Sequence, residues 1–157
     1  MNNIKEIKEV LETEGVFVST TAGMSMYPMI RNRKDVIVVK KCTERLKKYD
    51  VALYKVGDNH ILHRVLEVSN YSYVIRGDNC DRKEYGIKDE QILGVLTEFY
   101  RGDKKVNLNG WTYKIYIQLY CVCTPIRWVL RLGFRVIRKG IRIFRRRDKE
   151  TCDQNKL

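Results

Sequence analysis

The stretch Ile61-Leu62-His63-Arg64-Val65-Leu66-Glu67-Val68 predicts the returning strand of a β-hairpin. The turn signal Gly57-Asp58-Asn59 precedes it, and the strand-forming residues 46–54 come before that turn. Because alternate side chains of a strand point to the same face, His63 shares one face with its apolar neighbours two residues away. We expect His60, at the start of this strand, to face solvent. A histidine on an apolar face is usually a packed core residue unless other residues give it a chemical role.

The rest of the N-terminal two thirds also has a strand pattern. Further β-branched or aromatic segments occupy residues 16–21, 35–40, 72–76, 89–94 and 95–100. Before them, apolar residues recur at helical spacing from Ile4 to Leu11, and Gly15 ends that pattern. We therefore expect a mainly β fold with a coiled mixed or antiparallel sheet and a short N-terminal helix. An exposed edge strand at residues 16–21 would be able to pair with an extended peptide.

A serine-containing turn follows the first predicted strand, with the sequence Gly23-Met24-Ser25-Met26-Tyr27-Pro28. Gly23 allows a ligand to approach the backbone closely, and Pro28 restricts the chain after the serine. A serine hydroxyl becomes a nucleophile only with a base in hydrogen-bond reach, a group that orients the base, and donors for the oxyanion. Alone, this pattern is typical of an ordinary turn.

Two further motifs follow the serine turn in order. They are His63-Arg64-Val65 and Gly77-Asp78-Asn79. Together with the Gly-x-Ser-Met-x-Pro box, they resemble the signal peptidase I and LexA-type serine peptidase clan over roughly residues 16–97. The histidine motif resembles the endoplasmic-reticulum-type signal peptidases, which have a histidine where other members have a lysine. The resemblance implies a coiled β-sheet peptidase core and serine endopeptidase activity.

The resemblance also implies roles for individual residues. Ser25 matches the nucleophile and His63 the general base. An acid that orients the histidine lies several residues beyond the Gly-Asp-Asn box in this family. Asp81, three residues after Asp78, is the preferred match for that acid, and Asp78 is the alternative. A histidine near its ordinary pKa suits a base that works close to neutrality.

The oxyanion and substrate-binding positions are expected around the serine turn, at Gly23, Met26 and Thr21. Signal peptidases often carry a serine at the position of Gly23, and its hydroxyl helps to hold the oxyanion. The backbone N–H of Ser25 remains as a donor, and Thr20 or Thr21 is a possible substitute. Loss of one such donor can lower the rate by a factor of about 10² to 10³.

Two turn positions depart from the family pattern. The family segments that match residues 35–40 and 46–54 tend to begin Gly-Asp-x-Val. Here Lys34 and Tyr49 stand in place of those glycines. We therefore expect these two turns to differ in detail from those of the family.

Length and charge define the organisation of the chain. Its 157 residues suffice for one domain with a core, and 31 basic against 19 acidic residues give a formal net charge of +12. This surplus favours an anionic partner, such as a lipid surface, nucleic acid or an acidic substrate. We divide the chain into an N-terminal amphipathic helix (1–15), a peptidase core (16–109), aromatic and basic amphipathic C-terminal helices (110–147) and a polar tail (148–157).

The five cysteines show neither a zinc-binding spacing nor a disulfide framework. Reduced thiols are therefore expected, and we expect no metal or other cofactor. The N-terminus is charged from its first residues, so we expect no cleavable signal peptide. No apolar stretch has the length that a membrane-spanning helix needs.

The C-terminal region predicts a basic amphipathic helix that begins at Thr124-Pro125. One side of this helix carries an arginine stripe formed by Arg127, Arg131, Arg135, Arg138, Arg142 and Arg146. Apolar residues occupy the opposite side, which is typical of a helix that lies in a membrane interface. We expect peripheral association with an anionic membrane. The alternative is that the apolar side packs on the sheet and the arginines are solvated.

The leading functional hypothesis is a serine endopeptidase that removes a signal or leader peptide near a membrane. A LexA-type self-cleaving regulator is less favoured, because only 24 residues precede Ser25 and a DNA-binding domain does not fit there. A nucleic-acid-binding protein that uses the basic helix lacks a supporting motif. A non-catalytic member of the clan is the last alternative, because Gly23 provides no hydroxyl for the oxyanion.

Overall fold

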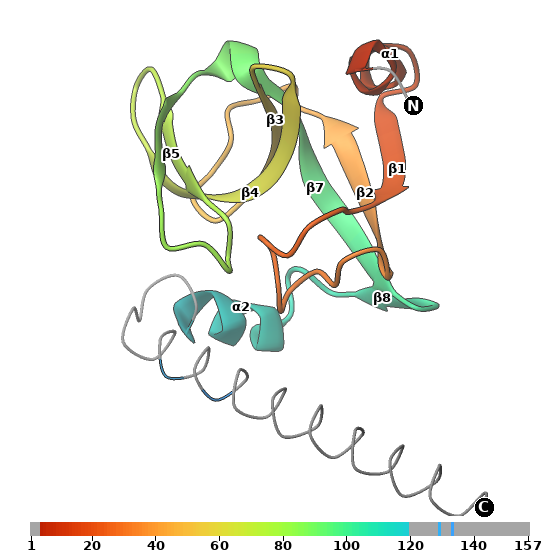
Figure 1. Ribbon diagram of the computed structural model, residues 1–157, viewed down its shortest axis with the longest axis vertical. Helices are drawn as coiled ribbons and strands as arrows, with labels where there is room; N and C mark the ends of the chain where they lie inside the picture. Colours follow the sequence, from red (N-terminus) through yellow and green to blue (C-terminus); the bar gives the residue numbers. More distant parts are fainter. Residues whose placement is uncertain (1–3, 120–128, 130–132, 134–157) are drawn as a thin grey trace, which may run out of the picture. The chain divides into compact units, whose positions relative to one another are not determined.

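The computed structural model describes residues 4–119, 129 and 133, and its architecture is mainly β (Figure 1). The chain divides after Lys114 into two compact units, and the sheet lies in the first. In chain order the elements are α1 (Ile4–Thr13), β1 (Val16–Thr20), β2 (Asp35–Lys41), β3 (Val51–Val56), β4 (Asn59–Val68), β5 (Tyr73–Arg76), β6 (Glu84–Ile87), a 3-10 turn (Asp89–Gln91), β7 (Ile92–Arg101), β8 (Lys104–Val106) and α2 (Trp111–Ile117).

The strands form one curled sheet that resembles half of a barrel (Figure 1). Its order is β1-β2-β7-β3-β4-β5-β6, and β8 pairs with β7. Each strand pairing in the described part of the chain is antiparallel. The predicted hairpin is confirmed, since β3 and β4 pair with Ala52 opposite His63. The mainly β class, the coiled antiparallel sheet and the short N-terminal helix are confirmed as well.

Several predicted strand limits differ from the observed ones. Residues 46–50 form a turn before β3, because the Asp50 carboxylate accepts a hydrogen bond from the Lys47 N–H at 2.7 Å. Residues 89–91 are a 3-10 turn, and β7 then continues without interruption to Arg101. The short strands β6 and β8 were not predicted, because four and three residues are too few to show a clear alternation.

The turn before β3 shows why the missing glycine matters. Tyr49 has a φ of 78°, in the left-handed region that glycine adopts most easily. A side chain in this conformation costs about 1–2 kcal/mol. Two hydrogen bonds to its backbone hold it in place: the Tyr49 N–H donates to Val65 O at 2.8 Å, and the Tyr49 carbonyl accepts from the Arg64 guanidinium at 3.0 Å. At the other turn that differs from the family pattern, before β2, the residue with a positive φ is Arg33, at 53°, and not Lys34.

The main apolar core lies on one face of β3, β4 and β5. Ala52, Val65 and Ile75 are completely buried there. Leu46, Tyr54, Tyr73 and Ile87 complete this cluster. His63 lies on the same strand as Val65 and is itself buried. The core therefore fixes the strand that carries the predicted general base.

Most of the predicted C-terminal helices lie outside the described residues. Trp111–Ile117 forms α2, whereas all six arginines of the arginine stripe and the polar tail 148–157 are not described. Among the residues that are described, no helix combines the length and the apolar character needed to cross a bilayer. The membrane expectation thus stays a prediction from sequence.

Candidate active site

Ser25 lies in the loop between β1 and β2, and neighbouring residues hold this loop on both sides. The Asn79 N–H donates to the Ser25 carbonyl at 2.7 Å, and the Asn79 side chain donates to the Met24 carbonyl at 3.0 Å. On the other side, the Gly23 N–H donates to Asn32 Oδ1 at 3.0 Å. The Gly-Asp-Asn motif therefore positions the serine through its asparagine.

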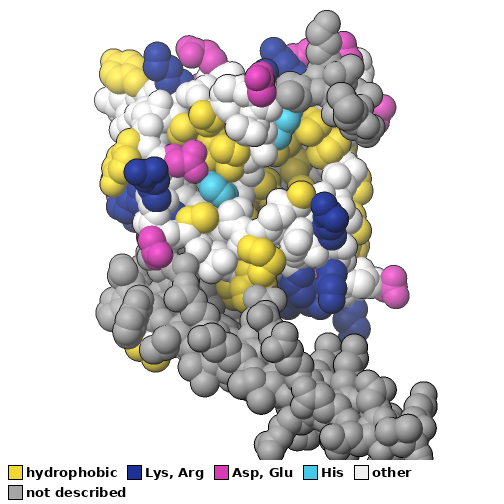
Figure 2. Space-filling view, viewed as in Figure 1, with side chains coloured by type: hydrophobic (Ala, Val, Ile, Leu, Met, Phe, Trp, Pro, Cys, Tyr) yellow, Lys and Arg dark blue, Asp and Glu magenta, His cyan; other side chains and the backbone are white. Residues whose placement is uncertain are grey.

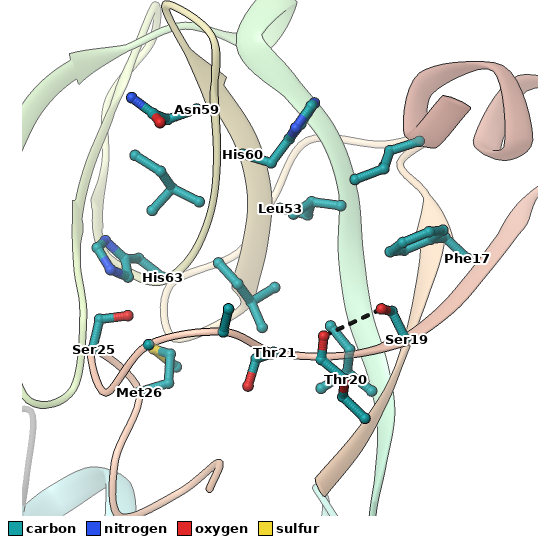
Figure 3. Close-up of a pocket in the computed structure, with 16 residues that line it drawn as sticks. Phe17, Ser19, Thr20, Thr21, Ser25, Met26, Leu53, Asn59, His60 and His63 are labelled. Carbon is teal, nitrogen blue, oxygen red and sulfur yellow. Dashed lines mark hydrogen bonds between the residues drawn. The ribbon is translucent and has the colours of Figure 1, made fainter. Parts of the chain in front are cut away.

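His63 lies beside Ser25 at one end of a cleft (Figure 3). A Cβ built on Gly77 would lie 2.9 Å from His63 Nε2 and 2.8 Å from the Ser25 carbonyl oxygen. Any side chain at Gly77 would thus push the histidine and the serine loop apart. The absence of a side chain at Gly77 therefore lets Nε2 and the Ser25 carbonyl both approach the same point.

The other ring nitrogen of His63 contacts two polar side chains. Its Nδ1 lies 2.9 Å from Glu84 Oε1 and 3.1 Å from the Tyr54 hydroxyl. An ionised Glu84 only accepts hydrogen bonds, so we assign the proton of the neutral imidazole to Nδ1. This tautomer leaves the lone pair on Nε2, at the edge of the ring next to Gly77.

Burial controls the ionisation of this group of residues. It lowers the pKa of His63 below its ordinary value, while the hydrogen bond and charge of Glu84, and the charge of Asp78, oppose the shift. Burial also raises the pKa of Tyr54, and Glu84 raises it further. At neutral pH the imidazole is therefore uncharged and able to accept a proton, while Tyr54 keeps its hydroxyl hydrogen.

The carboxylate that contacts His63 is a different one from the two that were expected. The carboxylate at Nδ1 belongs to Glu84 in β6, not to Asp81, whose side chain is exposed, or to Asp78. Asp78 instead pairs with the buried Arg64, at 2.8 and 2.7 Å. The reason is the strand pleat: Arg64 follows His63 in β4, so the two side chains point to opposite faces and Asp78 lies on the arginine's side.

The backbone explains why a serine is absent at the expected oxyanion position. Gly23 has a φ of 103°, which a residue with a side chain would adopt only under strain. Its N–H is bound to Asn32, so it does not face the cleft as a free donor. Within the described part of the chain, no acceptor is found for the Ser25 N–H, which therefore remains the candidate oxyanion donor.

The cleft has a volume of about 490 Å³ and extends from Ser25 and His63 to Phe17 of β1 (Figure 3). Thr20, Thr21, Gly23 and Met26 line it, together with apolar residues of β2, β3 and β4. His60 also lines it and is partly buried, contrary to the expectation that it faces solvent. In Figure 2 an apolar hollow lies between the chain's two histidines.

β1 forms one wall of the cleft and is an edge strand. It pairs only with β2 among the described residues, so its other edge is open. The Lys41 N–H donates to Gly15 O at 2.9 Å, and hydrogen-bonded pairs alternate along an antiparallel ladder. The backbone groups of residues 16, 18 and 20 consequently point to the open edge. The cleft thus offers both apolar walls and unpaired backbone groups.

The sequence interpretation missed Glu84 and Tyr54. Glu84 comes six residues after Asp78. This distance agrees with the resemblance, which places the orienting acid several residues beyond the Gly-Asp-Asn motif. Tyr54 pairs with Ile61, two residues from His63, so it shares the histidine's face of the sheet. The register of β3 against β4 would have placed Tyr54 beside His63, but only after the hairpin turn had been located correctly.

No group of three or more potential ligands (His, Cys, Asp or Glu) that could hold a metal ion occurs within the described residues. Comparison of the chain with protein-family models and with curated proteins finds no match.

Proposed function

We propose that this protein is a serine endopeptidase of the signal peptidase type. The observation that carries the proposal is the arrangement around His63: Nε2 lies next to Gly77, which also adjoins the Ser25 carbonyl, while Nδ1 contacts Glu84. A nucleophile, a base and a group that orients the base are the three parts that serine acylation requires. Ser25 and His63 line the end of a cleft with an open β-edge, and Glu84 contacts Nδ1 of His63.

The proposed reaction begins with attack of Ser25 Oγ on the carbonyl carbon of the scissile peptide bond. His63 Nε2 takes the hydroxyl proton as the new C–O bond forms, and the carboxylate of Glu84 stabilises the resulting imidazolium. The Ser25 N–H donates to the oxyanion of the tetrahedral intermediate. His63 then gives its proton to the leaving amine, and water hydrolyses the acyl-enzyme with the same base.

The open edge of β1 supports an extended peptide as the substrate. An added strand would receive and donate backbone hydrogen bonds at residues 16, 18 and 20, as in β-augmentation. The pairing would bring the scissile bond to Ser25, which follows β1 in the chain. Because backbone hydrogen bonds do not depend on sequence, the cleft side chains would set the specificity.

The finer proposal is that the substrate is a signal or leader peptide processed near a membrane. It is supported by the motif resemblance and by the arginine stripe in the sequence of the C-terminal region, which suits an anionic bilayer surface. A membrane-bound enzyme would meet such substrates at the surface on which they arrive.

Substitution of the two reacting residues tests the peptidase activity. Cleavage of a quenched fluorescent peptide library should fall by about 10⁴-fold or more in Ser25→Ala and in His63→Ala, and the double variant should be little worse, since these residues act as a unit. Ser19→Ala is the matched control, because Ser19 lines the same cleft and its hydroxyl donates to the carbonyl of Thr20 at 3.2 Å. Undiminished cleavage by folded Ser25→Ala would exclude this mechanism.

A further inference from the structure

Arg64 is completely buried, and its guanidinium binds groups from separate segments of the chain. Nε and one terminal nitrogen donate to the Asp78 carboxylate at 2.8 and 2.7 Å, and that terminal nitrogen also donates to Met29 Sδ at 2.8 Å. The other terminal nitrogen donates to the Tyr49 carbonyl at 3.0 Å and to the Tyr113 hydroxyl at 2.8 Å. Because a guanidinium has five N–H donors, these bonds use all of them.

Two of these partners belong to the parts of the chain that build the candidate active site. Asp78 lies in the Gly-Asp-Asn motif, whose asparagine binds the carbonyl of Ser25. Met29 is buried in the loop between β1 and β2, residues 21–34, which we call the Ser25 loop. Arg64 itself directly follows His63 in β4. The position of the guanidinium is therefore tied to the positions of the proposed nucleophile and base.

Tyr113 comes from the first turn of α2, which follows the sheet in the chain. Its neighbours Trp111, Thr112 and Lys114 are exposed, whereas Tyr113 is partly buried. Arg64 Cζ lies 5.5 Å from the centre of the Tyr113 ring, so this side chain contacts the charge both as an acceptor and as a cation–π partner. A buried N–H that loses its acceptor costs free energy unless the group moves or takes up water.

We infer that Tyr113 is a positioning residue for the Ser25–His63 site and acts by holding the guanidinium of Arg64 in place. Loss of its hydroxyl leaves one N–H donor without its acceptor, and the guanidinium then shifts together with Asp78 and Met29, so that the Ser25 loop loosens. The first turn of α2 is thus part of the working enzyme, and the first compact unit of the chain runs to Lys114 rather than to residue 109. The effect on catalysis rests on the proposed function, whereas the effect on the loop does not require it.

The experiment compares full-length Tyr113→Phe with the wild type on the best-cleaved peptide of the quenched fluorescent library. Phenylalanine keeps the ring beside Arg64 and removes only the hydroxyl. We expect kcat to fall by about 10-fold or more, the effect of losing one hydrogen bond to a charged group. Tyr113 is not among the residues that line the cleft, so KM should change by less than about threefold. Circular dichroism verifies that each variant is folded at the assay temperature.

Two control variants separate this contact from other effects of substitution. Tyr71→Phe makes the same chemical change at a side chain that is 85% exposed. Thr112→Val removes a hydroxyl from the exposed side of the same turn of α2 and keeps the branched shape of the side chain. Both should keep kcat within about twofold of the wild type, as exposed substitutions usually do. A loss of kcat in either control as large as that in Tyr113→Phe would overturn the inference.

Amide hydrogen exchange, followed by NMR, reports on the Ser25 loop without any need for cleavage. The Asn79 N–H donates to the Ser25 carbonyl at 2.7 Å, and the Ile30 N–H donates to the Met26 carbonyl within the loop at 2.9 Å. Both amides should exchange about 10-fold faster in Tyr113→Phe, because local opening of the loop becomes easier. The Lys41 amide, at the far end of β2, is the internal reference and should not change.

The two proposals fail in different ways. Unchanged exchange of the Asn79 and Ile30 amides in folded Tyr113→Phe would overturn this inference, and so would an unchanged kcat, while the peptidase function would stand. Faster exchange in Tyr113→Phe of a protein whose wild type cleaves no peptide would support the role of Tyr113 in the loop and count against the peptidase.

Discussion

Replacement of Glu84 by glutamine tests the geometry of the site most directly. Glutamine has nearly the same shape, and its amide oxygen is able to accept the Nδ1–H of His63, so the substitution removes mainly the charge. A unit negative charge 2.9 Å from a protonated imidazole is worth about 6 kcal/mol at an effective dielectric constant of 20. The Glu84 side chain is 30% exposed, so solvent screens part of this energy.

We therefore expect kcat/KM of Glu84→Gln to fall by about 10²- to 10⁴-fold, which corresponds to about 3–5 kcal/mol of transition-state stabilisation. The pH profile provides a second readout that a purely structural effect would not move. Glu84 raises the pKa of His63, so its removal should shift the acid limb of kcat/KM to lower pH. Glu84→Asp keeps the charge and should retain more activity than Glu84→Gln.

Asp81→Asn is the matched control, because it removes one carboxylate at an exposed position just before β6. It should change kcat/KM less than about threefold, as most exposed substitutions have small effects. Circular dichroism and thermal unfolding of each variant verify the fold. A larger loss in Asp81→Asn than in Glu84→Gln, or an unmoved acid limb in Glu84→Gln, would refute the assignment of Glu84.

Four further outcomes are expected. Gly77→Ala places a methyl group 2.8 Å from the Ser25 carbonyl oxygen. It should lower kcat/KM by about 10²-fold or more while destabilising the fold by only about 1–3 kcal/mol. Unchanged kinetics would contradict the close approach of Gly77 to Ser25 and His63. Asp78→Asn removes the carboxylate that pairs with the buried Arg64, and denaturant unfolding should report a loss of about 3–5 kcal/mol, against little loss in Asp81→Asn. In the wild-type protein kcat/KM should rise with pH only below 6.5, because burial lowers the pKa of His63. The stability of the fold should fall as the pH drops below 6.5, because the unfolded chain binds the proton of His63 more readily than the folded chain does. An acid limb of kcat/KM above pH 7 would contradict this. The full chain should sediment with anionic liposomes and be released by high salt, whereas a chain cut after Asn109 should not; equal sedimentation of both would exclude the C-terminal membrane contact.

The hairpin illustrates how far local sequence carries the prediction. The turn Gly57-Asp58-Asn59 and the alternation after it placed β4 within two residues and identified the face that carries His63. Residues 46–50 have a strand-like composition but form a turn, because a hydrogen bond to the Asp50 carboxylate competes with pairing. Short strands such as β6 depend on a neighbour for their existence, so their own residues give little signal.

The sequence by itself determined the mainly β class, the antiparallel hairpin and the candidate pair Ser25 and His63, because these depend on short motifs and on the two-residue period of a strand. Only the tertiary structure decided which carboxylate holds the imidazole. Glu84 comes from β6, which β5 separates from the strand of His63 in the sheet, and the pleat sends Asp78 to the opposite face to pair with Arg64. The cleft, too, arises only when the sheet curls and brings β1 and β4 to its two sides, because no local pattern records how far a sheet bends.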